Sequence, residues 1–223
     1  FHRYCVDASW TVPHFEKMLY DNAQLLALFA DVGRLTPRPD VDDAARRTAA
    51  YLLDALRTPD GCFWSAQDAD TAAGEGAYHT WTPAELADAL GPDDAAVAAA
   101  WFGVTERGHI DGGRSVLTAR ADAAAVAALA GVDDDVLPVR LAGIRDRLAA
   151  VRRRGEPPAT DRKVIAGWNA LAIDALARAG TALDAPDLVA AAARAADALT
   201  AALRIDTPAG PRLFEMRQRR AVD

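Results

Sequence analysis

Alanine is the feature that most restricts the fold of this chain, because it supplies 53 of the 223 residues. Alanine has the highest intrinsic helix propensity and lets neighbouring helices approach closely. Hydrophobic residues make up 51% of the chain and charged residues 26%, which is typical of a globular protein and not of a disordered one. The composition therefore predicts an all-α fold with a sizeable core.

Apolar periodicity and capping signals predict where the helices lie. A first helix is expected to run through His14 toward Arg34, since apolar residues recur there at helical spacing. Thr82 followed by Glu85 is a capping-box signature for a short helix. Further helices are predicted over residues 40–56, 93–102, 122–130, 134–154, 163–179 and 186–203.

The amino-acid pattern changes in the segment before the capping box. Residues 62–65 and 78–81 are rich in aromatic side chains and are predicted to be two short strands that flank a polar loop. Helix pairs joined by such loops indicate an α/α architecture. On periodicity alone, a bundle, a solenoid and a toroid all remain open.

Charge and cysteine content exclude several classes of function. The net charge of −7 argues against a nucleic-acid or anionic-membrane surface, because such surfaces need clustered positive charge. No apolar run is long enough to span a membrane, and no signal peptide is visible. Cys5 and Cys62 form no C-x-x-C motif, so neither a disulfide framework nor a structural zinc site is expected. The chain has no initiator Met, which predicts a piece of a longer protein.

The densest group of polar side chains follows Trp10. On the predicted helix His14, Lys17 and Asp21 share one side, while Glu16 and Tyr20 neighbour each other. A histidine in the first helical turn is near the positive end of the helix dipole, which favours neutral imidazole. Neutral imidazole can act as a general base near pH 7. The alternative is a solvated helix face with ordinary ion pairs.

Two further groups are candidates for ligand contacts. Asp68, Asp70 and Glu75 lie on a glycine-containing loop and could bind a cation, contact sugar hydroxyls or provide acid and base groups, although an ordinary acidic connection looks the same. Trp168 is expected in the core, while Asn169 could orient a ligand or a loop. No EF-hand, phosphate loop, nucleophile elbow or zinc helix is present, so no cofactor and no metal are predicted.

Several runs together form a long family signature: residues 1–4, 12–23, 68–70, 75–76, 81–82 and 163–169. They resemble the large thioredoxin-domain proteins related to spermatogenesis-associated protein twenty. The order and approximate spacing agree from the first residue to about residue 180.

The resemblance implies a fold and a setting. In that family a thioredoxin-like domain precedes an (α/α)6 toroid similar to six-hairpin glycosidases and N-acylglucosamine 2-epimerases. Residues 1–223 would be a fragment of a single toroid domain with short β-hairpin insertions. The upstream thioredoxin-like domain and the final toroid helices would be absent from this chain. Carbohydrate handling then follows by analogy of fold, with a sugar or sugar-like ligand, the thioredoxin-like domain of the same full-length protein as partner, and a cytoplasmic location.

The expected reaction remains open between two enzyme classes. One is an epimerase-like proton transfer with His14 as base, and the other is glycoside hydrolysis by Asp70 and Glu75. A non-catalytic scaffold that supports a redox-active thioredoxin-like domain is the alternative. Ala72 and Arg162 replace acidic residues usual in the family, which weakens proposals that need an acid pair. The residues expected to bind substrate are Trp10, Lys17, Tyr20, Asp21, Asp68, Trp168 and Asn169.

Overall fold

The computed structural model describes residues 1–119 and 121–218. Its helices and strands gather in two compact units. The first unit contains residues 1–3, 16–68 and the chain from residue 159 onward, and the second contains residues 4–15 and 69–158.

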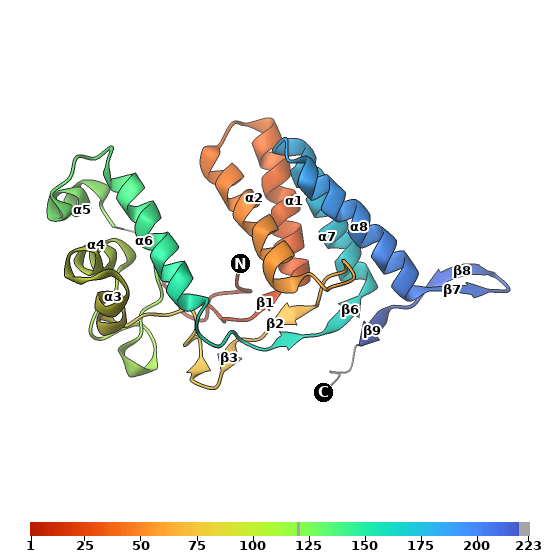
Figure 1. Cartoon of the computed structure of the whole chain (residues 1–223), viewed down its shortest axis with the longest axis horizontal. Helices are drawn as coiled ribbons and strands as arrows, with labels where there is room; N and C mark the ends of the chain where they lie inside the picture. Colours follow the sequence, from red (N-terminus) through yellow and green to blue (C-terminus); the bar gives the residue numbers. More distant parts are fainter. Residues whose placement is uncertain (120, 219–223) are drawn as a thin grey trace. The chain divides into compact units, whose positions relative to one another are not determined.

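Long helices form most of the first unit (Figure 1). They are α1 (Leu19–Leu35), α2 (Pro39–Tyr51), α7 (Ala166–Ala182) and α8 (Pro186–Leu203), and a π-helical turn (Leu52–Leu56) continues α2. Helix α1 packs against α2 and α7, and α7 packs against α8. Because the connections within α1–α2 and within α7–α8 are short, each pair is a helical hairpin.

Small side chains allow α1 and α7 to pack closely. Leu19 and Leu26 on α1 and Leu176 on α7 are fully buried in one hydrophobic core. Alanines fill the space between these larger side chains, and α7 alone buries Ala172, Ala175 and Ala179. The alanine content thus forms the tight interior that the composition predicts.

The first unit also contains a small sheet of short strands. The strands β1 (Lys17–Met18), β2 (Ala66–Gln67) and β5 (Thr160–Asp161) form an antiparallel sheet in the order β1-β2-β5. The prediction of a helix that runs through His14 is therefore wrong at its start, because α1 begins only at Leu19. Pairing with β2 keeps residues 17 and 18 extended.

Four more strands lie in two antiparallel pairs near the C-terminal part of the first unit. β6 (Lys163–Ile165) pairs with β9 (Met216–Gln218), and β7 (Arg204–Thr207) pairs with β8 (Gly210–Leu213). Strand β6 occupies the first residues of the helix predicted from residue 163, so α7 starts three residues later.

The second unit is built from shorter helices. They are α3 (Pro83–Leu90), α4 (Pro92–Phe102), α5 (Ala123–Ala130) and α6 (Leu137–Arg152), with a 3-10 turn at Asp111–Gly113. Helices α3 and α5 each pack against α4 and α6. Their shared core is a cluster of buried apolar side chains that includes Trp81, Leu86, Val97, Phe102, Val126, Leu141, Ile144 and Leu148.

A β-hairpin lies inside the segment predicted to be a polar loop. Strands β3 (Asp70–Thr71) and β4 (Gly74–Glu75) pair antiparallel, with Asp70 opposite Glu75. The predicted strands at 62–65 and 78–81 are wrong, because within the described residues these segments contribute only isolated bridges outside the named strands. Phe63 and Trp81, two of the aromatic side chains that suggested strands, are instead buried in the cores.

Local capping chemistry is confirmed at α3. The Thr82 side chain accepts a hydrogen bond from the backbone N–H of Glu85, and the Glu85 carboxylate accepts one from the backbone N–H of Thr82. Helical hairpins with short β-hairpins between them confirm the all-α class in both units. Over residues 1–119 and 121–218, the helices lack the combination of length and apolar character that crossing a bilayer demands.

An acidic side chain ties two helices of the second unit together. Asp94, in the first turn of α4, accepts a hydrogen bond from Arg140 Nε at 2.7 Å and another from Arg147. Both arginines belong to α6. The hydrogen bond from Arg147 is the main cause that holds the pKa of Asp94 below its usual value, with a smaller contribution from Arg140.

We expect Asp94→Asn to lower the free energy of unfolding by about 1–2 kcal/mol at pH 7, because charge-assisted hydrogen bonds are lost. Since the folded-state pKa is depressed, this stabilisation is present above the unfolded pKa of about 3.9 and is lost as the pH falls through the folded-state pKa. Urea unfolding from pH 7 to pH 2 should show the two stability curves converging. Asp93→Asn, at an exposed position of the same helical turn, is the control. A difference that stays constant with pH would contradict the assignment.

Candidate functional site

An acidic residue organises the loop that leads to His14. The Asp7 carboxylate accepts hydrogen bonds from the backbone N–H groups of Thr11 at 2.9 Å and Val12 at 2.6 Å. A hydrogen bond from the Ser9 side chain is the largest cause that lowers the pKa of Asp7 to about 2, and the backbone N–H groups add to it. Trp10 lies at the tip of this loop with 75% of its surface exposed. The loop therefore presents a large aromatic side chain to solvent.

The same loop fixes the position of His14. The backbone N–H of His14 donates to the carbonyl of Tyr4 at 2.8 Å, and the two rings stack with their centroids 5.2 Å apart. His14 Nδ1 lies 3.1 Å from Glu75 Oε1 on β4. The histidine and a carboxylate 61 residues away thus meet within the second unit.

His14 and Glu75 line a cavity of about 560 Å³, which we call the His14 cavity. Figure 1 shows the β3 hairpin that contributes to it. His14 is 27% exposed and Glu75 is 52% exposed, so both side chains are accessible to a ligand. The other residues that line the cavity are Val6, Val12, Pro13, Phe15, Ala73, Gly74, Ala77, Ile110, Asp111 and Arg114.

The segment that follows the β3–β4 hairpin packs tightly against Phe15, the residue after His14. This side chain is only 3% exposed, and its ring stacks on His79 with the centroids 6.0 Å apart. Gly76 follows Glu75 with a φ of +72°, and a Cβ added there would lie 2.3 Å from the Phe15 ring. Because glycine has no Cβ, the backbone at Gly76 can pass close to the Phe15 ring. This close approach brings together the segments that carry Glu75 and His14.

Asp70 occupies a different place from Glu75. It faces Glu75 across the β3–β4 pair but does not belong to the lining of the His14 cavity. Among the described residues, no group of three or more histidine, cysteine, aspartate or glutamate side chains is arranged to hold a metal ion.

The predicted helical face that joins His14 to Lys17 and Asp21 does not exist. His14 lies before the helix and in the second unit, whereas Lys17 and Asp21 lie in the first. The argument from the helix dipole therefore does not apply to His14. The ammonium of Lys17 lies 4.8 Å from the centroid of the Tyr51 ring, a cation–π contact.

Tyr20 and Asp21 meet at an arginine in the first unit. Arg3 donates hydrogen bonds to Glu16 at 3.1 Å and to the Tyr20 hydroxyl at 3.0 Å, and its Nε lies 3.7 Å from the Asp21 carboxylate. Burial raises the pKa of Asp21, and the positive charge of Arg3 opposes that shift. The Tyr20 ring also contacts Trp168, with the centroids 4.8 Å apart.

In the first unit Trp168 is partly buried and Asn169 is fully buried. Trp168 packs against its core, as the sequence predicts. Asn169 is fully buried, accepts a hydrogen bond from the Phe63 N–H at 2.8 Å, and donates to the carbonyls of Phe63 at 3.0 Å and Ile165 at 3.1 Å. These bonds give Asn169 a structural role. Asp68, also expected at the site, is exposed, and its backbone N–H donates to the carbonyl of Ala159.

Three side chains at these sites are not found by sequence reasoning. Tyr4 stacks on His14, Arg3 gathers Tyr20 and Asp21, and Arg114 lines the His14 cavity. Arg3 and Tyr4 belong to the first run of the family signature, residues 1–4, and this resemblance is the sequence signal that could have identified them. Arg114 follows a Gly-Gly pair that indicates only a loop, so no local pattern identifies it.

Comparison with known proteins identifies relatives. No protein-family model matches the chain. Human spermatogenesis-associated protein 20 is 32% identical over 214 residues, and the mouse protein is 31% identical over 217 residues. These matches cover 85% and 86% of this chain and 27% of each relative. The chain thus spans about a quarter of the length of the relatives it matches.

A solved structure of D-mannose isomerase is also similar to this chain, with 16% identity and a TM-score of 0.30, covering 98% of this chain and 49% of that one. The sequence matches confirm the resemblance predicted from the motifs: this chain is homologous to a segment of spermatogenesis-associated protein 20.

Proposed function

We propose that this chain is part of a carbohydrate-handling α/α toroid and that the His14 cavity binds a sugar or sugar-like ligand. The contact between His14 and Glu75 is the observation that supports the proposal most directly. A histidine held by a carboxylate at the edge of a cavity is an arrangement suited to proton transfer. The cavity volume of about 560 Å³ lies within the range of small-molecule sites.

The pair defines a chemical role for each partner. When the Glu75 carboxylate accepts the Nδ1–H of His14, the basic nitrogen of the imidazole is Nε2. The carboxylate then stabilises the imidazolium that forms when Nε2 takes a proton, as in other carboxylate–histidine pairs. Stacking on Tyr4 holds the ring in its plane. His14 is thus the proposed general base and Glu75 the residue that orients it.

The position of Asp70 favours proton transfer over glycoside hydrolysis. Hydrolysis needs two carboxyl groups on either side of the scissile bond, about 5–9.5 Å apart. Glu75 lines the His14 cavity and is engaged by His14, whereas Asp70 lies outside the lining, so the predicted pair of Asp70 and Glu75 does not face one ligand there. The other carboxylate in the lining is that of Asp111. An epimerase-like reaction uses the contact between His14 and Glu75 directly, so it is the reaction we propose.

A sugar panel tests this proposal on the purified protein. We expect a bound sugar to raise the melting temperature in a concentration-dependent manner. His14→Asn should reduce any isomerisation of that sugar by about 10²–10⁴-fold, the usual contribution of a general base. Glu75→Gln should reduce it less, since the imidazole remains. Glu106→Gln removes a carboxylate from an exposed position of the second unit and is the control.

Each product has a distinct meaning. An isomer of the same mass supports the proposal, while release of a shorter sugar would replace it with hydrolysis. Full activity in His14→Asn would refute the base assignment. If no sugar binds, the protein is better described as a scaffold for a thioredoxin-like domain of the same full-length protein.

We further infer a cytoplasmic location, since Cys5 and Cys62 are not joined by a disulfide.

A further inference from the structure

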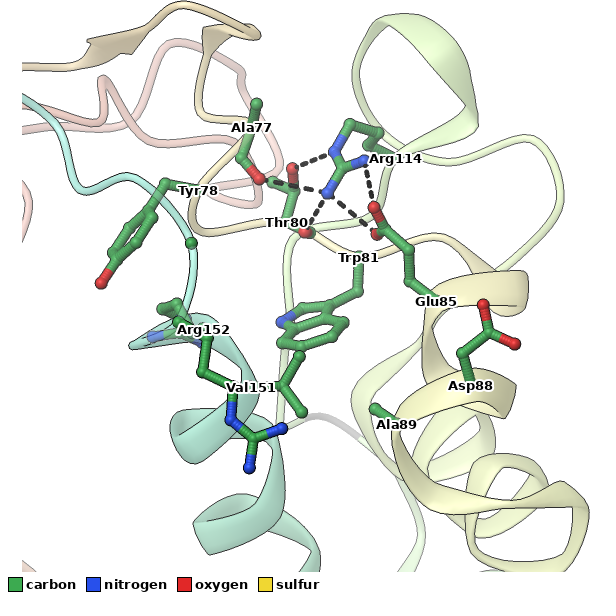
Figure 2. A pocket seen from close by; sticks show the side chains of 12 residues that line it. Ala77, Tyr78, Thr80, Trp81, Glu85, Asp88, Ala89, Arg114, Val151 and Arg152 are labelled. Atoms are coloured by element: carbon green, nitrogen blue, oxygen red, sulfur yellow. Dashed lines mark hydrogen bonds and ion pairs between the residues drawn. The ribbon is translucent and has the colours of Figure 1, made fainter.

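A second cavity in the second unit has a different chemistry from the His14 cavity. It has a volume of about 450 Å³, and we call it the Arg152 cavity (Figure 2). Ala77 and Arg114 line both cavities, so the two are neighbours. The full lining consists of Ala77, Tyr78, Thr80, Trp81, Glu85, Asp88, Ala89, Arg114, Val151, Arg152, Arg154 and Gly155.

One arginine of this cavity is saturated by protein partners. Arg114 forms two parallel bonds with the Glu85 carboxylate, at 2.8 Å and 2.9 Å. It also donates to the Thr80 hydroxyl and to the carbonyls of Thr80 and Ala77, as Figure 2 shows. All its nitrogen atoms are therefore engaged, and Arg114 forms a rigid wall of the cavity.

Two other donors in the cavity are buried without a partner. Trp81 is only 6% exposed, and among the described residues its indole Nε1 has no hydrogen-bond partner. The same holds for the Nε of Arg152. Burial lowers the pKa of Arg152, and the nearby Tyr78 offsets part of that shift. A buried donor without an acceptor is destabilising, so an acceptor from outside would bind favourably.

The charge balance indicates the sign of that acceptor. Arg114 and Glu85 neutralise each other, which leaves Arg152 and Arg154 against Asp88 alone. The cavity is thus positive although the chain carries a net charge of −7. Arg152 ends α6, where a cation complements the helix dipole. The dipole explains the presence of a cation there, but it leaves the Trp81 N–H unexplained.

We propose that the Arg152 cavity binds a small organic anion, whose carboxylate or phosphate group accepts hydrogen bonds from Arg152 and from the indole N–H of Trp81. Figure 2 shows the indole standing between the Arg114–Glu85 pair and the side chains of Val151 and Arg152. The apolar part of the ligand would lie against the indole and Val151. Charge-assisted bonds of this kind are the stronger hydrogen bonds in proteins.

Titration of the purified protein with benzoate, phenyl phosphate and benzyl alcohol tests this site. We expect at least one of the two anions to bind and the neutral alcohol, which has a ring of the same size, to bind at least about tenfold more weakly. The indole N–H resonance of Trp81, identified by its loss in Trp81→Phe, should move on binding of the anion. Whether the carboxylate or the phosphate binds more tightly identifies the preferred anionic group.

Two matched variants make the test specific. Arg152→Gln should weaken anion binding about tenfold or more. Because it removes a partly buried charge whose Nε has no hydrogen-bond partner among the described residues, we expect the fold to stay intact. Arg153→Gln removes the same charge from the next, exposed residue and should change binding less than twofold. The proposal fails if neither anion binds, if the Trp81 resonance does not move, or if the two variants have equal effects. Because neither variant alters His14 or Glu75, failure here leaves the sugar proposal unaffected.

Discussion

Replacement of Asn169 by leucine is expected to lower the free energy of unfolding by about 3 kcal/mol or more. The side chain is fully buried, and its amide binds both the N–H and the carbonyl of Phe63. Leucine has a similar size but offers no polar atom, so both backbone groups would stay buried without partners. Each such group costs about 1–3 kcal/mol. Urea-induced unfolding followed by far-UV circular dichroism measures the loss.

Gln24→Leu is the matched control for this substitution. It makes the same change from amide to leucine at an exposed position of α1. We expect it to change stability by less than about 0.5 kcal/mol, as most surface substitutions do. Equal stability of Asn169→Leu and the parent protein would show that Asn169 does not hold the Phe63 segment against α7, and would restore the prediction that it contacts a ligand.

Gly76→Ala is expected to destabilise the second unit by about 2–4 kcal/mol. Two costs add: a non-glycine residue at a φ of +72° is strained, and its Cβ would lie 2.3 Å from the Phe15 ring. Phe15 is buried and packed on His79, so it cannot move away freely. Because Glu75 precedes Gly76, the contact from Glu75 to His14 should also be disturbed. Thermal unfolding measures the loss of stability, and titration with the sugar that the parent protein binds measures the effect on the His14 cavity.

Gly131→Ala separates strain from collision. Gly131 has a comparable φ of +63°, but a Cβ there meets nothing within 4 Å. We expect this control to cost only about 1 kcal/mol, the strain of the left-handed backbone. If the two variants lose the same stability, the collision with Phe15 is not significant, and the packing described between the hairpin and the His14 loop is incorrect.

Local chemistry explains the predictions that the structure confirms. The capping box at Thr82 and Glu85 spans three residues, so all the atoms involved belong to one short segment. Helix α8 begins and ends within one residue of its predicted bounds, because proline at its start and a long alanine-rich run specify it without help from other segments. The core role of Trp168 follows equally from helical spacing.

Long-range pairing explains the errors. The sequence around His14 has helical spacing, but Lys17 and Met18 pair with β2 about 50 residues away, and α1 starts only after them. The segments predicted as strands at 62–65 and 78–81 pair only through single-residue bridges, Phe63 with Arg57 and Trp81 with Ser115, so neither extends into a strand. Strand formation depends on a partner, and the hairpin instead formed where a short turn let residues 70–71 meet residues 74–75.

The sequence by itself determined the helical class, most helix positions, the capping box at Thr82 and the relationship to spermatogenesis-associated protein 20, since these depend on composition, short spacing and matching motifs. Only the tertiary structure decided that His14 contacts Glu75, that the buried Asn169 side chain binds the backbone of Phe63, and that Arg152 and Trp81 line one cavity. Side chains separated by 61 to 106 residues come together through packing of whole elements, and no local pattern encodes which of them will touch.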